Sequence, residues 1–344
     1  MLRRRSQAHS NRNSGLILRL WIAARRLRKL KFNMKLGFMR RIAGSVLFVQ
    51  LLAFAALGPL PVFVAAQEQP EKYPPTIVFM SDFGTLDDSV AICKGVMYSI
   101  APDAHIFDLT HQVKPYSILD AARFLEGATA YYPAGTVFVA VVDPGVGSER
   151  RAIVAKSKRK QYFVLPDNGL ITLAGERDGI EGAREITNPA WIISGKVSAT
   201  FNGRDIFSPV AAHLARGEDW TQVGPELPVE KLVWLGVQPA KLSPHGITGE
   251  VIATDGPFGN LVTNIAADDF FKLGYKLGEQ VSIELNNQPM SLPFARTFSD
   301  VSSHQRLLYI DSRGRLALAI NKGNFAQIYH ISPPATLFVA KAPK

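Results

Sequence analysis

The chain has 344 residues, of which 47% are hydrophobic and 20% are charged, enough for one large or two medium-sized domains. Its net charge of +10 is concentrated in residues 1–66, which carry thirteen Lys and Arg and no Asp or Glu. From Gln67 onward, 26 basic residues face 29 acidic ones, so the remainder carries about −3. This distribution argues against nucleic acid as a partner, because the basic charge does not belong to a folded surface.

The first 66 residues have the pattern of a basic leader followed by a signal peptide. An uncharged apolar run (42–57) follows a basic segment, and small residues up to Ala66 suit cleavage. The run is shorter than the roughly 20 residues of a typical spanning helix, so cleavage is favoured over a retained membrane anchor. We expect an exported, periplasmic or extracellular protein that meets the membrane only through this segment, with a mature start near residue 67. Translation from Met1 or from Met34 stays open.

Beyond the leader, short apolar strands alternate with amphipathic helices. Strands are predicted at 76–80, 104–109, 135–142, 153–155 and 162–165, and helices at 88–100 and 117–131. The alternation predicts an α/β domain over residues 72–237, with a mostly parallel sheet flanked by helices. Cys93 is the only cysteine, so neither an intramolecular disulfide nor a thiolate metal cluster is possible.

The pattern changes after about residue 235, where a proline-containing segment (238–245) predicts a linker. Further strands are predicted at 247–253, 280–285, 307–310, 316–320 and 336–340, separated by Gly, Asn and Pro turns. Residues 246–344 are therefore expected to form a small all-β barrel domain, with a sandwich as the alternative.

Polar residues that follow apolar strands are the first candidates for a site, because ligands of open parallel sheets bind beyond the strands' carboxyl ends. Asp82 follows the first strand, with Asp87 and Ser89 one turn later. Asp143 follows the most apolar strand, and Arg150 comes seven residues after it. Two further polar segments lie at 202–205 and 255–260.

Each of these segments also has a purely structural interpretation, and the residues alone leave both open. Asp87 or Asp88 can cap the helix that follows. Asp143 can begin an ordinary turn, residues 204–205 can form a structural ion pair, and Asp255 can open a hairpin. The histidines show no metal-ligand spacing, and there is no P-loop and no Gly-x-Ser-x-Gly elbow.

Taken together, the motifs resemble the S-adenosyl-L-methionine (SAM) hydroxide adenosyltransferase family and its relatives, the SAM-dependent fluorinase and chlorinase. The ordered set is specific although each motif alone is weak, and it lies at 81–100, 142–147, 166–170, 202–205, 257–260 and 312–314. The resemblance implies an α/β domain joined to a C-terminal β-barrel. It also implies homotrimers that hold SAM between the N-terminal domain of one subunit and the C-terminal domain of a neighbour.

The implied reaction is attack of an activated water or hydroxide on the ribose C5′ of SAM, which gives adenosine and methionine. SAM is then the substrate, and neither a cofactor nor a metal is implied. In the hydrolase branch an Asp–Arg–His trio handles the water. Asp143 and Arg150 match the first two members, Asp143 to accept the proton and Arg150 to favour hydroxide. Asn202 occupies the place of the histidine, and an amide does not titrate near neutral pH.

The resemblance also implies binding roles for individual residues. Asp82 would accept hydrogen bonds from both ribose hydroxyls, and Tyr116 would pack beside the ribose and adenine. The remaining contacts are Asp87, Ser89 and Asp255 to the methionine ammonium, Arg313 to its carboxylate, Phe258 and Asn260 to adenine, and Phe201 and Phe298 as the walls that close the pocket.

Three alternatives to a SAM hydrolase stay open. A halogenase-type SAM-dependent transferase is disfavoured by Asp143, since a carboxylate repels a halide in a pocket with little water. An exported adenosyl- or nucleoside-binding protein with weak or lost activity would fit the change at Asn202. A metal-dependent nucleoside hydrolase is suggested by the acidic cluster of Asp82, Asp87 and Asp88.

Overall fold

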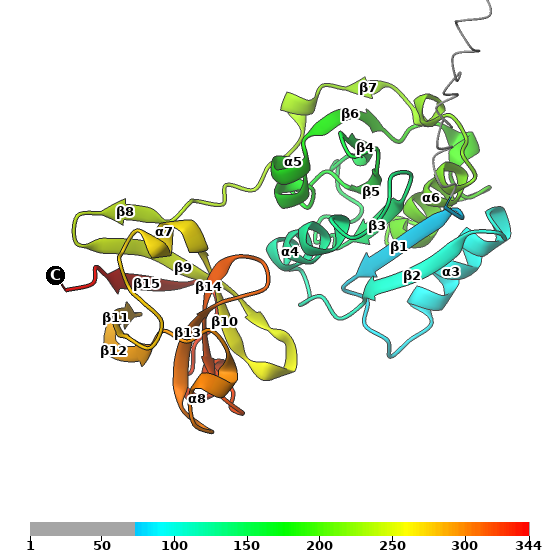
Figure 1. Cartoon of the computed structure of the whole chain (residues 1–344). Helices are drawn as coiled ribbons and strands as arrows, with labels where there is room; N and C mark the ends of the chain where they lie inside the picture. The colour runs from blue at the N-terminus through cyan, green and yellow to red at the C-terminus, as the bar shows by residue number, and fades with distance from the viewer. Residues whose placement is uncertain (1–72, 344) are drawn as a thin grey trace, which may run out of the picture. The chain divides into compact units, whose positions relative to one another are not determined.

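A computed structural model describes residues 73–343 of the chain (Figure 1). The predicted leader and its cleavage site lie outside the described residues. Within residues 73–343, no helix is long and apolar enough to cross a membrane. We call residues 73–237 the N-terminal lobe and residues 238–343 the C-terminal lobe, because each contains its own sheet.

The N-terminal lobe is built on a mixed seven-stranded sheet with the order β2-β1-β3-β5-β4-β6-β7. Its strands are β1 (Thr76–Ser81), β2 (His105–Thr110), β3 (Val137–Val141), β4 (Ala152–Ser157), β5 (Tyr162–Pro166), β6 (Ile180–Glu185) and β7 (Glu226–Leu227). Strands β2, β1, β3 and β5 are parallel, whereas β4, β6 and β7 join them antiparallel. The predicted α/β class is confirmed. The antiparallel half arises because a tight turn at 157–161 folds β5 back onto β4.

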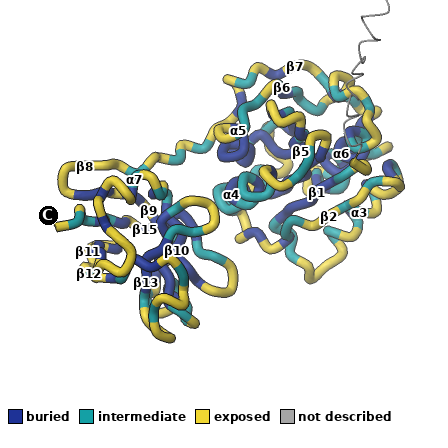
Figure 2. Tube along the Cα trace, viewed as in Figure 1, coloured by how far each residue is buried: buried dark blue, intermediate teal, exposed yellow. Residues whose placement is uncertain are grey.

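Helices cover both faces of this sheet (Figure 1). Helices α3 (Ser89–Ile100) and α6 (Ser208–Ala215) pack on one face, against side chains such as Phe79 and Val139. Helices α4 (Ile118–Thr129) and α5 (Thr172–Asp178) pack on the other face, against Met80 and Phe138. Successive strand residues point to opposite faces, so burial of both faces requires the uninterrupted apolar strands seen in the sequence. Figure 2 shows β1 as mostly buried, whereas β2 at the edge of the sheet is exposed or half-buried.

Short helical turns complete the N-terminal lobe. They are η1 (Pro189–Trp191), a π-helix η2 (Gly203–Phe207), η3 (Trp220–Val223) and η4 (Val229–Lys231). The π-helix leads directly into α6, and single π turns of this kind are frequent at functional sites. Cys93 lies beneath it: a Cβ added to Gly203 would stand 3.6 Å from the Cys93 Sγ. Burial raises the pKa of the Cys93 thiol to about 11.

The C-terminal lobe is an antiparallel sheet curled into a nearly closed barrel. Its strands are β8 (Lys241–Ser243), β9 (Gly246–Asp255), β10 (Asn260–Ala266), β11 (Gln280–Leu285), β12 (Gln288–Pro293), β13 (Arg306–Ile310), β14 (Arg315–Ile320) and β15 (Ala335–Ala340). They follow the order β12-β11-β15-β9-β10-β14-β13, with β8 paired to β9. A bridge between Phe294 and Leu308 connects the two edges, and Phe270 and Phe325 are buried in the core. The prediction of an all-β barrel is confirmed.

The barrel strands are connected by short helical turns. These are η5 (Gly256–Phe258), α7 (Ala267–Phe271), η6 (Phe298–Asp300) and α8 (Phe325–Ile328). Strand β8 lies inside the segment predicted as a linker, where Leu242 pairs with Ile247 of β9. Turns η5 and η6 contain Phe258 and Phe298, two aromatic residues that the family resemblance predicts to contact the substrate.

Candidate functional site

Asp82 lies at the carboxyl end of β1, where a sharp turn leads toward α3. Its Oδ2 accepts a hydrogen bond from the backbone N–H of Tyr116 at 3.0 Å. Tyr116 has a left-handed backbone (φ 67°), which is uncommon for a non-glycine residue, and its side chain is exposed. The structure therefore brings together these two residues, which the resemblance placed beside the ribose.

Asp87 and Ser89 meet at the start of α3. The Asp87 Oδ1 accepts a hydrogen bond from the Ser89 N–H at 3.0 Å, whereas Asp88 makes no side-chain capping bond. Asp88 is the N-cap residue but does not cap with its side chain, and Asp87, one residue earlier, caps the first N–H group of the helix instead. Asp87 is exposed and has a second carboxylate oxygen, so capping leaves it able to bind a ligand.

Asp143 and Arg150 form a tight ion pair just beyond β3. The Arg150 Nε donates to both carboxylate oxygens of Asp143, at 2.8 and 2.9 Å, and its Nη2 also contacts Oδ2. The two side chains are only 6% and 12% exposed, so water screens their attraction poorly. The Arg150 guanidinium also lies 5.3 Å from the ring centroid of Phe207. A turn closed by the Val146 N–H on the Asp143 carbonyl is present as well, so the turn interpretation is also correct.

Phe201 and Asn202 precede the π-helix, and the segment packs onto the turn after β1. The rings of Phe83 and Phe201 meet edge to face with centroids 6.0 Å apart. A Cβ on Gly203 would stand 2.9 Å from the Phe83 ring, so the close approach requires glycine there. The Asn202 side chain makes no capping hydrogen bond with this helix.

Residues 204 and 205 form the ion pair that the sequence suggested. The Arg204 Nε lies 2.6 Å from the Asp205 Oδ1, and the Ser198 N–H donates to Asp205 at 2.7 Å. Asp205 is fully buried. Burial opposes its ionisation, but the bonds from Arg204 and Ser198 outweigh this and lower the pKa of the carboxyl. The pair holds together the loop that carries Asn202.

These contacts gather three loops at the carboxyl edge of the parallel strands. Phe83 joins the loop after β1 to Phe201, and Arg150 joins the loop after β3 to Phe207 of the π-helix. A Cβ on Gly147 would stand 2.8 Å from the Ala199 carbonyl oxygen, which shows how closely the second and third loops approach. Asp82, Asp143 and Asn202 thus lie on loops that pack together, at the edge where α/β sheets bind ligands.

The C-terminal lobe contributes a separate cavity of about 710 Å³. Four predicted residues line it: Asp255, Phe258, Asn260 and Phe298. Asp255 ends β9, and the η5 turn connects it to Asn260 at the start of β10, so the hairpin interpretation is correct too. The turn closes through Gly259, whose left-handed backbone (φ 65°) brings it against Asn324.

Two acidic side chains, Asp255 and Asp311, and one basic side chain, Lys322, line this cavity. Burial, together with the neighbouring Asp311, raises the pKa of the Asp255 carboxyl, while Arg123 at 3.9 Å opposes the shift. Burial, together with the carboxyls of Asp255 and Asp311, raises the pKa of Tyr309. Two acidic groups beside the aromatic side chains of Phe258 and Phe298 provide the surroundings that cationic ligands prefer.

Arg313 lies outside this cavity, and its guanidinium is turned onto α4. Its Nη1 donates to the Arg123 carbonyl oxygen at 2.8 Å, and its Cζ lies 6.0 Å from the ring centroid of Phe124. Of the predicted C-terminal residues it is the one that the structure does not bring to the cavity, although its neighbour Ser312 lines it. The sequence missed other lining residues, namely Tyr309, Asp311, Asn321, Lys322 and Asn324. For the last three of these residues, the Asn and Gly content of 321–324 was the only local signal in the sequence.

The acidic residues do not form a metal centre in the part of the chain that the structure describes. No three His, Cys, Asp or Glu side chains between residues 73 and 343 are grouped so that they could hold a metal ion. Asp82 bonds to Tyr116 and Asp87 bonds to Ser89, so these carboxylates are engaged separately.

Known proteins share both lobes of this chain. The N-terminal domain model of the SAM hydroxide adenosyltransferase family matches residues 77–224, and the C-terminal domain model matches residues 249–337. An (R)-S-adenosyl-L-methionine hydrolase of Salinispora arenicola is 39% identical over 260 residues, which cover 75% of this chain and 95% of the relative. The chain belongs to the SAM hydroxide adenosyltransferase family.

Other members extend the comparison. A fluorinase of Actinoplanes sp. is 33% identical over 293 residues, covering 78% of this chain and 98% of the fluorinase. The crystal structure of an uncharacterized conserved protein from Thermotoga maritima matches with a TM-score of 0.73 and 37% identity, over 76% of this chain and 99% of that one.

Proposed function

We propose that this protein hydrolyses SAM to adenosine and L-methionine. The observation that carries the proposal is the Asp143–Arg150 ion pair beyond β3, on a loop packed against the one that carries Asn202. Relatives named (R)-S-adenosyl-L-methionine hydrolase, at 38 to 39% identity, support the same reaction.

In the proposed mechanism a water molecule attacks the ribose C5′ in line with the departing sulfur. Asp143 orients this water and accepts its proton, and Arg150 favours the developing hydroxide by its charge. Methionine leaves as a neutral thioether, so the sulfonium needs no general acid. Asn202 contributes a hydrogen bond to the water without titrating. The protein's work is to orient and desolvate one water.

The proposed substrate contacts use both lobes. Asp82 accepts the ribose hydroxyls beside Tyr116, and the acidic C-terminal cavity suits the positive charge of the methionine ammonium. The other proposed contacts are Asp87, Ser89 and Asp255 with the ammonium, Phe258 and Asn260 with adenine, Phe201 and Phe298 as closing walls, and Arg313 with the carboxylate. The last contact requires the Arg313 guanidinium to leave its place on α4.

A halogenase-type transferase is the second candidate, because fluorinases are among the relatives at 31 to 33% identity. Asp143 disfavours it. A carboxylate that is 6% exposed repels a halide ion approaching the same position.

Product analysis tests the proposal directly. The protein is incubated with SAM in H₂¹⁸O, with and without chloride or fluoride and with and without a chelator. We expect adenosine that carries ¹⁸O at the 5′ position, together with methionine, in every condition. Halogenated adenosine would instead establish the transferase, and free adenine or loss of activity with chelator would indicate a metal-dependent nucleoside hydrolase. Tight SAM binding without turnover would identify a binding protein.

We also propose that the protein is exported and forms homotrimers, as the leader pattern and the family resemblance imply. Export is measured by fractionating cells that express the full chain and sequencing the N-terminus of the mature protein, for which we expect a start near residue 67. Light scattering of the purified protein reports its assembly state. A monomer that turns over SAM at full rate would refute the trimer.

A further inference from the structure

A chain of hydrogen bonds runs beneath the turn that carries Asp82. The Oγ of Ser81, which is fully buried at the end of β1, lies 2.7 Å from the His111 Nδ1. The His111 Nε2 lies 3.0 Å from the Asp108 Oδ1, and the other oxygen of Asp108 lies 2.6 Å from the Lys94 Nζ. This series of hydrogen bonds therefore links a backbone turn in the core to an exposed ion pair between β2 and α3.

The surrounding groups fix the direction of the hydrogen bonds to Asp108. Burial opposes ionisation of Asp108, but the bonds from Lys94 and His111 outweigh it and lower the pKa of this carboxyl, so Asp108 only accepts. The His111 Nε2 then carries the hydrogen that it donates to Asp108, and the Nδ1 shares one hydrogen bond with the Ser81 hydroxyl, as its donor or its acceptor. This leaves the Ser81 Oγ to accept from the Phe83 N–H at 3.3 Å. Ser81, His111, Asp108 and Lys94 therefore each have at least one hydrogen-bond partner along this path.

His111 also holds the far side of the same turn. Its carbonyl oxygen accepts from the Gly84 N–H at 2.7 Å, and its ring packs edge to face on Phe79 at 4.7 Å. Two backbone N–H groups immediately after Asp82, those of Phe83 and Gly84, are thus tied to Ser81 and His111. These bonds hold the backbone that follows Asp82, and the Tyr116 N–H holds the Asp82 carboxylate itself.

We propose that Ser81, His111 and Asp108 are positioning residues that aim the Asp82 carboxylate at the two hydroxyls of a ribose. The inference rests on the ribose-binding role of Asp82 in the proposed function. It assigns the selection of ribose over 2′-deoxyribose to this hydrogen-bonded chain, which lies behind the ligand surface rather than on it. Catalysis at C5′ belongs to Asp143 and is separate.

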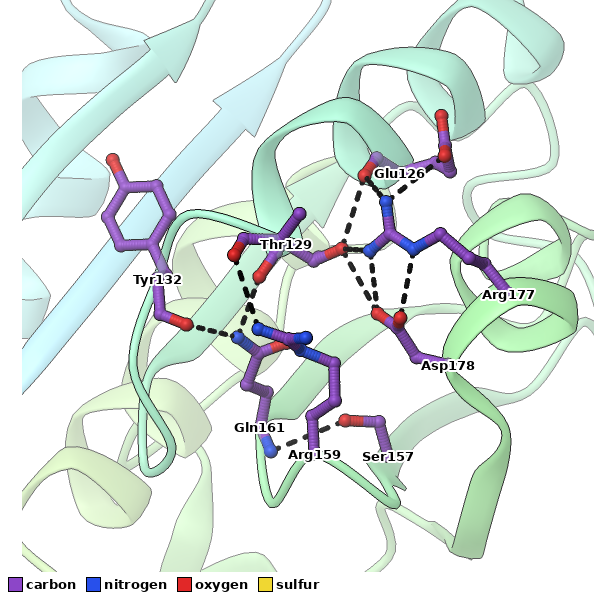
Figure 3. Close-up of polar contacts among 9 residues, drawn as sticks. Glu126, Thr129, Tyr132, Ser157, Arg159, Gln161, Arg177 and Asp178 are labelled. Carbon is purple, nitrogen blue, oxygen red and sulfur yellow. Dashed lines mark hydrogen bonds and ion pairs between the residues drawn. The ribbon is translucent and has the colours of Figure 1, made fainter. Parts of the chain in front are cut away.

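Figure 3 shows a second buried polar network that serves as a matched control. Gln161 donates to the carbonyl oxygens of Thr129 and Tyr132, at 2.9 and 2.7 Å, and the Ser157 Oγ accepts from the Gln161 N–H. Ser157 is as fully buried as Ser81. Gln161 immediately precedes β5, so this network lies at the amino end of that parallel strand, opposite the candidate site.

The test compares the dissociation constants of adenosine and 2′-deoxyadenosine by titration calorimetry on the full folded protein. For the wild type we expect adenosine to bind about 10- to 100-fold more tightly, since hydrogen bonds to a charged acceptor are among the strong ones. In Ser81→Ala the ratio should fall to within about threefold of one, because a misdirected carboxylate loses the hydroxyl contacts and little else. Ser157→Ala should keep the wild-type ratio.

A second pair of variants covers the case in which Ser81→Ala does not fold. Asp108 is half exposed, so Asp108→Ala leaves the core intact while releasing the His111 ring, and we expect it to reduce the ratio part of the way. Its control is Glu181→Ala, which removes another partly exposed carboxylate paired with a lysine. Equal weakening of both nucleosides by Asp108→Ala or Ser81→Ala, with the ratio unchanged, would overturn the inference.

The two proposals fail in different ways. A wild type that prefers adenosine but does not convert SAM would refute the hydrolase while the positioning role stands. A wild type that converts SAM but binds both nucleosides equally would refute the positioning role, since Asp82 would then not select the ribose diol.

Discussion

Two consecutive arginines each neutralise a buried aspartate at the end of a neighbouring strand. Arg150 pairs with Asp143 beyond β3, and Arg151 pairs with Asp167 beyond β5, where its Nε donates to Oδ2 at 2.9 Å. The carboxylate side chains are 6% and 1% exposed. Asp143→Asn and Asp167→Asn therefore make the same chemical change in closely similar surroundings, and only the first removes a proposed proton acceptor.

The structure sets the expected size of each effect. Removing one partner of a buried ion pair costs about 3 to 5 kcal/mol in the free energy of unfolding, and the retained amide oxygen places both variants near the lower end. Asp167→Asn also keeps the bond from the Val233 N–H to Oδ1. For turnover, loss of a general base lowers kcat about 100- to 10,000-fold, so Asp143→Asn should lose activity and Asp167→Asn should keep it.

The assay combines urea unfolding with adenosine release from saturating SAM, measured well below the unfolding midpoint of each variant. Similar losses of stability with a loss of kcat confined to Asp143→Asn would agree with the mechanism. Equal losses of kcat in the two variants would show that turnover follows stability. Full turnover in Asp143→Asn would refute the role of this carboxylate in activating water.

Three further predictions concern neighbouring features. Asp205→Asn should lower the free energy of unfolding by about 3 kcal/mol at pH 7. Because the folded pKa of Asp205 is depressed, urea unfolding at stepped pH should show this deficit shrinking as the pH falls below about 4, where the carboxyl of the unfolded chain binds its proton before that of the folded protein does. Asn202→His should raise kcat and add a titration near pH 6.5 to the rate profile. Gln161→Leu removes the amide donor of the Tyr132 carbonyl and leaves the Thr129 carbonyl only its bond from the Tyr132 N–H, so it should cost about 1 to 3 kcal/mol by urea unfolding and leave kcat unchanged.

Elements with strong local signals were predictable from the sequence. The helix predicted at 117–131 forms as Ile118–Thr129, and the Ser117 Oγ accepts from the Asp120 N–H at its start, as a capping serine should. The strand predicted at 135–142 forms as Val137–Val141 with every residue buried. In both cases the local sequence pattern was enough to predict the element.

Other elements depend on partners that are distant in the sequence. Strand β12 contains Pro289 and Pro293, which argue against a strand, yet it forms because it lies at an edge of the barrel sheet. The antiparallel addition of β4 follows from a turn whose direction the strand pattern does not encode.

The contacts of the candidate site also divide into those that the sequence predicted and those that depend on distant partners. Asp143 and Arg150 are seven residues apart and were grouped by the family resemblance, and the structure joins them in one ion pair. The contact of Arg313 with Arg123 spans 190 residues, and the bond between Ser81 and His111 spans 30. No periodicity or turn signal reports such contacts, so they appear only once the chain is folded.

The rate at which the single cysteine is chemically labelled can report how often the loop at the site opens. Cys93 lies on α3 beneath Gly203, so a reagent reaches its sulfur only when α3 and the π-helix separate. That separation also moves the neighbouring Asn202. The rate at which a disulfide reagent labels the native protein therefore measures how often this loop opens, without any engineered probe. A ligand that holds the loop closed slows the labelling, so the thiol reports occupancy of the site as well as its opening.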